Sequence, residues 1–125
     1  MSNKKPKIYN PKNLIKAIEK WPNPICDVKH GHDIYVEGKA RSNQTRLEHI
    51  IQYRHNLKVK DIELIPNAIS HYFDYKKDPT YKNTYNYYIK RGGKDKGLIK
   101  VSIRISDNDP KHAWVKTIYI TYKIK

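Results

Sequence analysis

Alternating apolar and polar residues in the last third of the chain place the strongest constraint on its fold. Residues 98–105 carry Ile or Val at every second position, and residues 114–125 alternate again after a polar loop. Side chains of a strand point in turn to the two faces of a sheet, so this pattern is typical of strands with one buried face. A further strand is expected at 85–90, before a Gly-containing turn at 91–95. The pattern predicts an antiparallel meander of three strands. In the last strand Ile118, Ile120, Tyr122 and Ile124 are expected on one side, and Val115, Thr117, Tyr119, Thr121 and Lys123 on the other.

Two segments nearer the start have the apolar spacing of amphipathic helices. The first, residues 11–21, begins with proline and ends at Trp-Pro, which are common helix boundaries. The second, residues 42–56, opens with Thr45 and Glu48 at the spacing of a capping box. The apolar positions are Leu14, Ile15 and Ile18 in the first segment and Leu47, Ile50 and Ile51 in the second.

The remaining segments are predicted to be shorter elements. Residues 57–70 are expected to form a helix, a break at Pro66 and a short second helix. The tripeptide His30-Gly31-His32 is expected to be a turn between two strands. Short strands are expected at 25–29, 33–37 and 71–76.

At 125 residues the chain has room for one domain, residues 1–125, with one core. Residues 1–10 are polar and basic and are expected to be flexible. Together these elements predict an α+β fold, in which N-terminal helices pack on a curved antiparallel sheet.

The charge of the chain is strongly one-sided. Lys and Arg number 26 against 12 Asp and Glu, which gives a formal net charge of +14 spread along the whole sequence. Such an excess points to a polyanionic partner, and the 11 tyrosines offer flat surfaces on which nucleobases can stack. The ordinary alternative is that tyrosine fills strands, where aromatic residues are favoured, and that the cations form a solvated face.

Several classes of function lack their motifs here. Cys26 is the single cysteine, so the chain can form no internal disulfide and no Cys-based zinc site. His30 and His32 could form a metal pair, but no carboxylate or cysteine follows at ligand spacing, so no metal or other cofactor is expected. The sequence contains no phosphate-binding glycine loop, no nucleophile elbow and no apolar run of membrane-spanning length. No membrane contact is therefore expected, and the expected location is the cytoplasm.

Two groups of polar residues could carry chemistry. The polar side of the last two strands is expected to present Lys100, Ser102, Arg104, Thr117, Tyr119 and Thr121, which can hold phosphate oxygens. On the segment 42–56, Arg46, His49 and Tyr53 share one helical face, and Arg54 and His55 lie in the last turn. A helical histidine is more often structural, but the neighbouring arginines favour a functional interpretation.

These residue types suit metal-free cleavage of RNA. A base takes the proton from the ribose hydroxyl beside the scissile phosphate, and that oxygen attacks the phosphorus in line. An acid protonates the leaving oxygen, while Lys or Arg stabilises the developing charge. DNA lacks the hydroxyl, so the same site would spare DNA.

An ordered pattern of short motifs supports this interpretation. It runs from Arg-Leu-Glu-His49-Ile-Ile-Gln-Tyr-Arg54-His55 through Asp61-Ile-Glu-Leu-Ile-Pro66-Asn-Ala-Ile to Tyr88-Ile-Lys90, Ile99-Lys-Val-Ser-Ile and Val115-Lys-Thr117-Ile-Tyr119. Over residues 42–125 the pattern resembles the phage-associated branch of the barnase–EndoU–colicin–RelE superfamily. That branch comprises metal-independent RNases found in phage proteins and bacterial toxin tips.

The resemblance implies a nuclease core over residues 42–125, with helices followed by a sheet. It implies that His49, Arg54 and His55 match the helix motif of the family, that Lys90 matches its basic strand residue, and that Thr117 matches its C-terminal strand hydroxyl. It also implies RNA as the partner, with tRNA among the candidates, an immunity or antitoxin protein as a second partner, and action in the cytoplasm of a host or target bacterial cell.

The leading hypothesis is a metal-independent endoribonuclease of phage or toxin type. The catalytic candidates are His49, His55, Lys90 and Thr117, with the two histidines as acid and base. The residues expected to bind RNA or phosphate are Arg46, Arg54, Lys100, Arg104, Tyr119 and Thr121. The hypothesis requires the two imidazoles to lie over the polar side of the sheet. Two alternatives stand beside it: a non-catalytic basic module that binds nucleic acid, and a phage protein that binds an acidic host protein.

Overall fold

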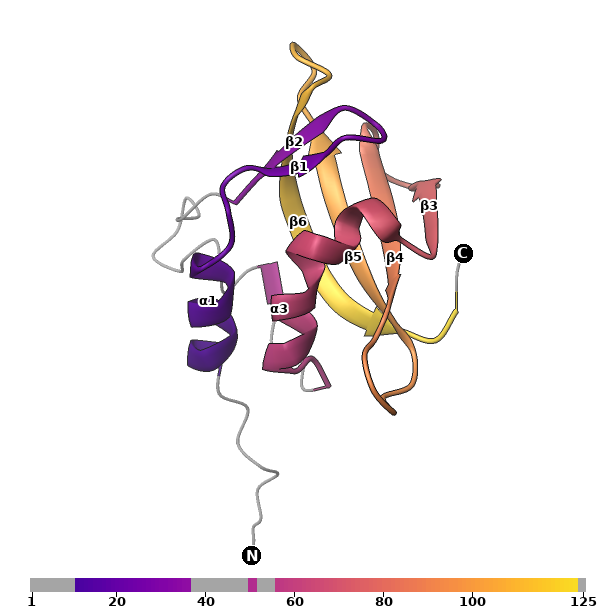
Figure 1. The fold of residues 1–125 in the computed structure, drawn as a ribbon. Helices are drawn as coiled ribbons and strands as arrows, with labels where there is room; N and C mark the ends of the chain where they lie inside the picture. Colours follow the sequence, from indigo (N-terminus) through magenta and orange to yellow (C-terminus); the bar gives the residue numbers. More distant parts are fainter. Residues whose placement is uncertain (1–10, 37–49, 52–55, 124–125) are drawn as a thin grey trace, which may run out of the picture.

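Six strands form one curled, mixed sheet in the part of the chain that the structure describes, and two α-helices pack against one of its faces (Figure 1). The computed structural model describes residues 11–36, 50–51 and 56–123. Strand order across the sheet is β1-β2-β6-β5-β4-β3, and the architecture is α+β, as predicted. The elements in chain order are α1 (Pro11–Glu19), β1 (Ile25–Asp27), β2 (His32–Tyr35), α3 (Val59–Ala68), the 3₁₀ turn η1 (Ile69–His71), β3 (Asp74–Lys77), β4 (Thr84–Lys90), β5 (Leu98–Ile105) and β6 (His112–Thr121).

The predicted meander is present, but the sheet is not wholly antiparallel. Strands β3, β4, β5 and β6 pair antiparallel in chain order. The hairpin β1–β2 joins them through a parallel pairing between residues 33–35 of β2 and 112–114 of β6. The prediction of an antiparallel sheet is wrong in this respect, because pairing between distant parts of a chain leaves no local pattern. The strand predicted at 71–76 is also wrong at its start, since η1 occupies residues up to His71 and β3 begins at Asp74.

A bulge in β6 reverses the predicted facing of its first half. Ser102 pairs with Thr117 but Ile103 pairs with Val115, so Lys116 is an extra residue on β6. One extra residue in a strand changes which side chains face the core. Val115 is therefore buried, with 2% of its surface exposed, although strict alternation predicts it on the same side as Thr117.

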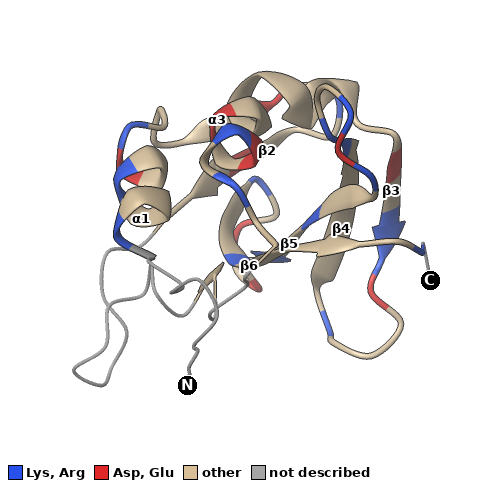
Figure 2. Ribbon diagram, turned by 90° about the horizontal axis from the view of Figure 1, so that it is seen from below, with Lys and Arg blue, Asp and Glu red and all other residues tan. Residues whose placement is uncertain are grey.

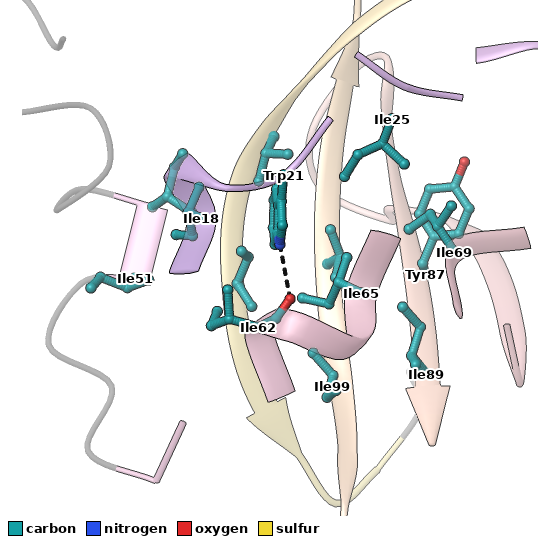
Figure 3. Close-up of a cluster of buried hydrophobic side chains, with 14 of the residues drawn as sticks. Ile18, Trp21, Ile25, Ile51, Ile62, Ile65, Ile69, Tyr87, Ile89 and Ile99 are labelled. Carbon is teal, nitrogen blue, oxygen red and sulfur yellow. Dashed lines mark hydrogen bonds between the residues drawn. The ribbon is translucent and has the colours of Figure 1, made fainter. Parts of the chain in front are cut away.

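The core lies between one face of the sheet, which we call the inner face, and the helices α1 and α3 (Figure 3). Apolar side chains at alternate positions of β4, β5 and β6 meet the apolar stripes of the helices, and each fully buried one contributes about 1.5–3 kcal/mol. Ile50 and Ile51, which lie in the predicted helix 42–56, are fully buried in the same core. Other members are Leu14, Ile18, Trp21, Ile62, Ile65, Tyr87, Ile89, Ile99, Val101, Ile103 and Ile118.

Helix α3 continues through Pro66, so the break predicted there is wrong. A proline has no N–H to donate to the carbonyl four residues earlier, which for Pro66 is the carbonyl of Ile62. The indole Nε1 of Trp21 donates a hydrogen bond of 2.9 Å to that carbonyl oxygen instead (Figure 3). Trp21, which lies just after the end of α1, thereby supplies the hydrogen bond that the proline cannot donate and connects the chain at that point to α3.

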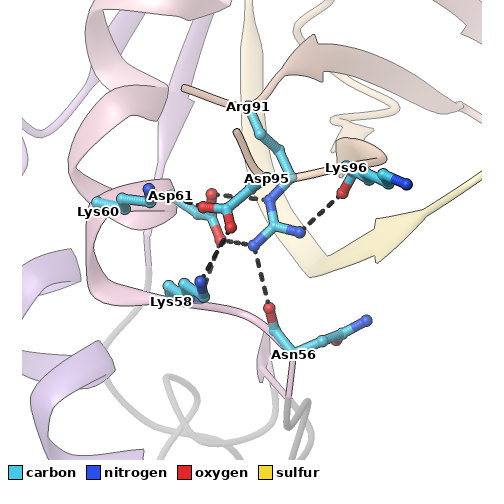
Figure 4. Close-up of polar contacts among 7 residues, drawn as sticks. All are labelled: Asn56, Lys58, Lys60, Asp61, Arg91, Asp95 and Lys96. Atoms are coloured by element: carbon cyan, nitrogen blue, oxygen red, sulfur yellow. Dashed lines mark hydrogen bonds and ion pairs between the residues drawn. The ribbon is translucent and has the colours of Figure 1, made fainter. Parts of the chain in front are cut away.

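The N-terminal end of α3 is tied to the β4–β5 turn by Arg91 (Figure 4). Its guanidinium donates two hydrogen bonds to the carboxylate of Asp61, at 3.1 and 2.8 Å. It also donates to the backbone carbonyls of Lys96 at 2.9 Å and of Asn56 at 3.2 Å. Only 5% of the Arg91 side chain and 1% of the Asp61 side chain are exposed. The hydrogen bonds to Asp61 raise the pKa of Arg91 above its ordinary value.

Candidate nucleic-acid interface and an aromatic cluster

The candidate site residues that the structure describes lie on the face of the sheet opposite the helices. We call this face the outer face. Directly opposed residues of antiparallel strands share a face. Lys100 lies opposite Tyr119, Ser102 opposite Thr117, and Leu98 lies between Lys90 and Thr121. The core residues between them point to the inner face. The residues brought together on the outer face are Lys90, Lys100, Arg104, Thr117, Tyr119 and Thr121.

The centre of the outer face combines cations with aromatic rings. The Nζ of Lys100 donates a hydrogen bond of 2.9 Å to the Tyr119 hydroxyl. The same Nζ lies 5.2 Å from the ring centroid of Tyr119 and 6.0 Å from that of Tyr88. Lys90 Nζ lies 5.0 Å from the ring centroid of Phe73, whose side chain is 53% exposed. Tyr88 is only 1% exposed, so the Lys100–Tyr119 and Lys90–Phe73 pairs are the ones that hold a charge beside an accessible flat surface. This arrangement suits a sugar–phosphate backbone with stacked bases.

Two other polar residues of this face are committed to the protein itself. Ser102 is buried, and its hydroxyl donates to Asn86 Oδ1 at 2.6 Å, so it is a structural residue and not part of the hydroxyl surface expected from the sequence. Asn86 in turn donates to Asp78 at 3.1 Å.

Arg104 Nη2 lies 3.9 Å from Asp107, and its buried Nε has no hydrogen-bond partner among the described residues.

The candidates of the segment 42–56, namely Arg46, His49, Arg54 and His55, lie outside the described residues. The neighbouring Ile50 and Ile51 are buried in the core on the inner side of the sheet. Lys90, Lys100 and Thr117 occupy the outer face. Ile50 and Ile51 thus lie across the sheet from Lys90, Lys100 and Thr117, so the described residues bring together only the cationic, hydroxyl-bearing half of the predicted site and do not bring the histidine segment to the outer face.

A second group of ionisable residues lies on the inner face beside the helices. It includes His30 and His32, which the sequence suggested only as a possible metal pair. His30 Nε2 and the Tyr72 hydroxyl are hydrogen-bonded at 2.8 Å, and His32 Nε2 and the Tyr75 hydroxyl at 2.9 Å. The rings of His30 and Tyr75 stack at a centroid distance of 3.8 Å and an angle of 10°. These contacts join the β1–β2 hairpin to β3, the opposite edge strand of the sheet. The His–Tyr cluster comprises Asp27, His30, His32, Tyr72, Tyr75, Tyr85 and Tyr87.

Asp27 fixes the turn that carries the first histidine. Its side chain is buried, and its Oδ1 accepts the backbone N–H groups of Lys29 at 3.0 Å and His30 at 3.3 Å. Its Oδ2 accepts the hydroxyl hydrogen of Tyr87. Burial, helped by the hydrogen bond to Asp27, raises the pKa of Tyr87 far above its ordinary value. Gly31 completes the turn with a positive φ of 74°, which glycine adopts without strain.

His32 is held in a setting that favours its neutral form. Burial lowers the pKa of His32, and the charge of Asp27 opposes this shift. Only 8% of the residue is exposed. The nearby backbone carbonyl of Pro110 also acts to raise this pKa. The Nδ1 atom of His32 has no hydrogen-bond partner among the described residues. Among the described residues, no group of three His, Cys, Asp or Glu side chains is placed to hold a metal ion.

The sequence contains one signal of this cluster, but the signal is indirect. Tyr85 and Tyr87 alternate along β4 with the core positions of β5, since Tyr85 lies opposite Ile103 and Tyr87 opposite Val101. That alternation predicts an inner-face location for both rings. The contact with the histidine turn could not be predicted, because it depends on the curl that brings the two sheet edges together.

Basic residues occur on the helices, the strands and the loops alike, as Figure 2 shows. None of the helices in the described ranges is long and apolar enough to cross a membrane. No protein-family model, curated protein or solved structure matches this chain.

Proposed function

We propose that the chain is a metal-independent endoribonuclease that binds the RNA backbone on the outer face of β4, β5 and β6. One observation carries the proposal: three cations and three hydroxyl groups, nominated from the sequence, share that face and come from three adjacent strands. The order of helices followed by a meander supports a fold like that of the barnase–EndoU–colicin–RelE superfamily.

The described residues have distinct tasks in this proposal. Arg104 and Lys90, on either side of Lys100, neutralise the phosphates that flank the scissile one. Thr117 lies in the row next to the Lys100–Tyr119 pair and donates a hydrogen bond to a phosphate oxygen. The Lys100 ammonium, which the Tyr119 hydroxyl positions, stabilises the charge that develops on the phosphorus oxygens.

The proposal assigns proton transfer to His49 and His55, and it requires their side chains to reach the outer face although Ile50 and Ile51 are buried on the inner side of the sheet. One takes the proton of the 2′-hydroxyl as that oxygen attacks phosphorus, and the other protonates the 5′ oxygen as the P–O bond breaks. The products are a 2′,3′-cyclic phosphate and a free 5′-hydroxyl. The substrate is RNA in the cytoplasm of a host or target bacterial cell, with tRNA as the first substrate class to test and an immunity or antitoxin protein as the expected inhibitor.

Incubation of the purified protein with tRNA and total RNA in excess EDTA tests the proposal. We expect cleavage that leaves cyclic phosphate ends, and none of an oligonucleotide whose 2′-hydroxyls are replaced by hydrogen. His49→Ala and His55→Ala are expected to abolish turnover, and Lys100→Gln to reduce it. Lys94→Gln is the matched control, because Lys94 is an exposed lysine of the β4–β5 turn away from the outer-face residues. Cleavage that requires a divalent metal ion would contradict the mechanism.

The second candidate is a non-catalytic module that binds nucleic acid, and the cation–aromatic pairs of Lys100 and Lys90 favour it. It predicts binding whose logarithm falls linearly with the logarithm of salt concentration, without any RNA product. In that case His49→Ala and His55→Ala leave RNA binding unchanged. Binding of an acidic host protein instead predicts capture that persists after nuclease treatment.

A further inference from the structure

Loops at one end of the sheet form an open cavity beside Tyr85, a ring of the His–Tyr cluster. Its volume is about 610 Å³, within the range of sites for small organic ligands. The loops that follow β3 and β5 form its walls, and Tyr85 forms part of its lining. The lining residues are Lys82, Asn83, Tyr85, Ile105, Ser106, Asp107 and Pro110.

A stack of nearly parallel rings ends at this cavity. His30 stacks on Tyr75 at 3.8 Å and 10°, and Tyr75 stacks on Tyr85 at 5.4 Å and 11°. Tyr85 is half-buried, so part of its surface is open where it lines the cavity. A flat heteroaromatic ring placed in the cavity extends this stack by one member, and nucleobases stack on aromatic side chains irrespective of sequence.

The polar lining of the cavity is rich in hydrogen-bond acceptors. Asn83 Nδ2 donates to Asp107 Oδ1, which fixes the orientation of the Asn83 amide because a carboxylate cannot donate. The Asn83 Oδ1 therefore remains as an acceptor at the wall, and the second carboxylate oxygen of Asp107 lies 3.9 Å from Arg104 Nη2. Asn83 is held there with a positive φ of 53°, and its carbonyl accepts the N–H of Ile105 at 2.8 Å. A base with an exocyclic amino group matches this wall, whereas uracil presents a carbonyl oxygen at the same position.

A cation completes the set of groups. Lys82 lines the same cavity and is exposed, so its ammonium can reach a phosphate on the ribose of the bound base. We propose that this cavity binds a nucleoside monophosphate with an amino-bearing base, stacked on Tyr85, with its base edge on Asn83 and Asp107 and its phosphate on Lys82. The proposal does not depend on RNA cleavage, although Asp107 also lies 3.9 Å from Arg104 of the outer face.

Titration of the ¹⁵N-labelled protein with cytidine and uridine monophosphates tests the proposal. We expect saturable binding of the cytidine nucleotide with shifts confined to residues 82–85 and 105–110, tighter binding than for uridine monophosphate, and weaker binding of cytidine without phosphate. Tyr85→Leu is expected to weaken binding about 5- to 150-fold, the range for losing one base–aromatic stack. Tyr81→Leu is the matched control, because Tyr81 is an exposed tyrosine of the same loop that does not line the cavity.

Three results would overturn the proposal. The first is no saturable binding to the wild-type protein at about 1 mM nucleotide, the range of weak small-ligand affinities. The second is binding whose shifts map to Lys100 and Tyr119, which would assign the nucleotide to the outer face. The third is equal loss of affinity in Tyr85→Leu and Tyr81→Leu. Because the wild-type shifts locate the site, a Tyr85→Leu protein that fails to fold still leaves the proposal open to refutation.

Discussion

Replacing Arg91 with methionine measures what the buried guanidinium contributes to stability. The variant keeps an apolar stem of similar length but removes the four hydrogen bonds to Asp61, Lys96 and Asn56. The Asp61 carboxylate, 1% exposed, then keeps the hydrogen bond from the Lys58 N–H, at 2.9 Å. Removing one member of a buried ion pair costs about 3–5 kcal/mol, because an uncompensated charge stays buried. An exposed pair contributes about 0–1 kcal/mol.

We therefore expect Arg91→Met to lower the free energy of unfolding by about 3–5 kcal/mol. Urea unfolding followed by circular dichroism measures this, and an unchanged slope with denaturant shows that only stability has changed. Lys94→Met is the control and is expected to stay within about 0.5 kcal/mol of the wild type. The double variant Asp61→Asn/Arg91→Met removes the unpaired charge and is expected to be more stable than Arg91→Met alone. A cost below about 1 kcal/mol for Arg91→Met would refute the reasoning, because it would place the pair in the class of exposed ion pairs.

Two further predictions concern α3 and the His–Tyr cluster. Trp21→Phe leaves the buried Ile62 carbonyl without its hydrogen bond and is expected to cost about 1–3 kcal/mol in urea unfolding. Adding Pro66→Ala, which restores the helical N–H donor, is expected to recover part of that loss; additive effects would contradict the account of α3. Because the folded pKa of His32 is lowered, the neutral form is favoured in the folded state. Stability is then fully present above about pH 6.5, the unfolded value, and is lost as the pH falls through the folded pKa. We expect the His32 Hε1 resonance to titrate below pH 6.5 and His32→Gln to flatten this part of the stability profile; a midpoint above pH 6.5 would count against it.

The strands of the last third could be predicted because each has one buried face. Leu98–Ile105 has the predicted bounds, and the partners of Lys100 lie on the predicted face. The predicted facing of the residues before Thr117 is wrong because Lys116 is an extra residue at a bulge. A bulge inserts a residue without changing the residue types around it, so the sequence pattern does not reveal it. The prediction of a break at Pro66 is wrong for a related reason, because the compensating donor is Trp21, which follows α1 and is 41 residues from Ile62 in the sequence.

Only the strand residues of the site could be placed from the sequence, because the alternation along a strand determines which face of the sheet each side chain occupies. Lys100, Thr117 and Tyr119 share a face because they occupy alternate positions of paired strands. The His–Tyr cluster depends on the curl of the sheet, which brings His30 to Tyr72 across its two edges. Arg91 was expected in a turn, and its role as the partner of Asp61 depends on where α3 begins relative to the end of β4. Both contacts join segments that carry no shared local pattern.

The parallel pairing of β2 with β6 imposes an order on folding during synthesis. The ribosome delivers the hairpin β1–β2 before any other strand, yet the strand beside which it docks is the last of the described strands to emerge. The meander β3–β6 can form from neighbouring segments, whereas the hairpin must wait for β6 and then close the longest loop in the sheet. Until then the edge of β2 is open, so a nascent chain halted before residue 112 exposes a β-edge that is covered in the completed sheet.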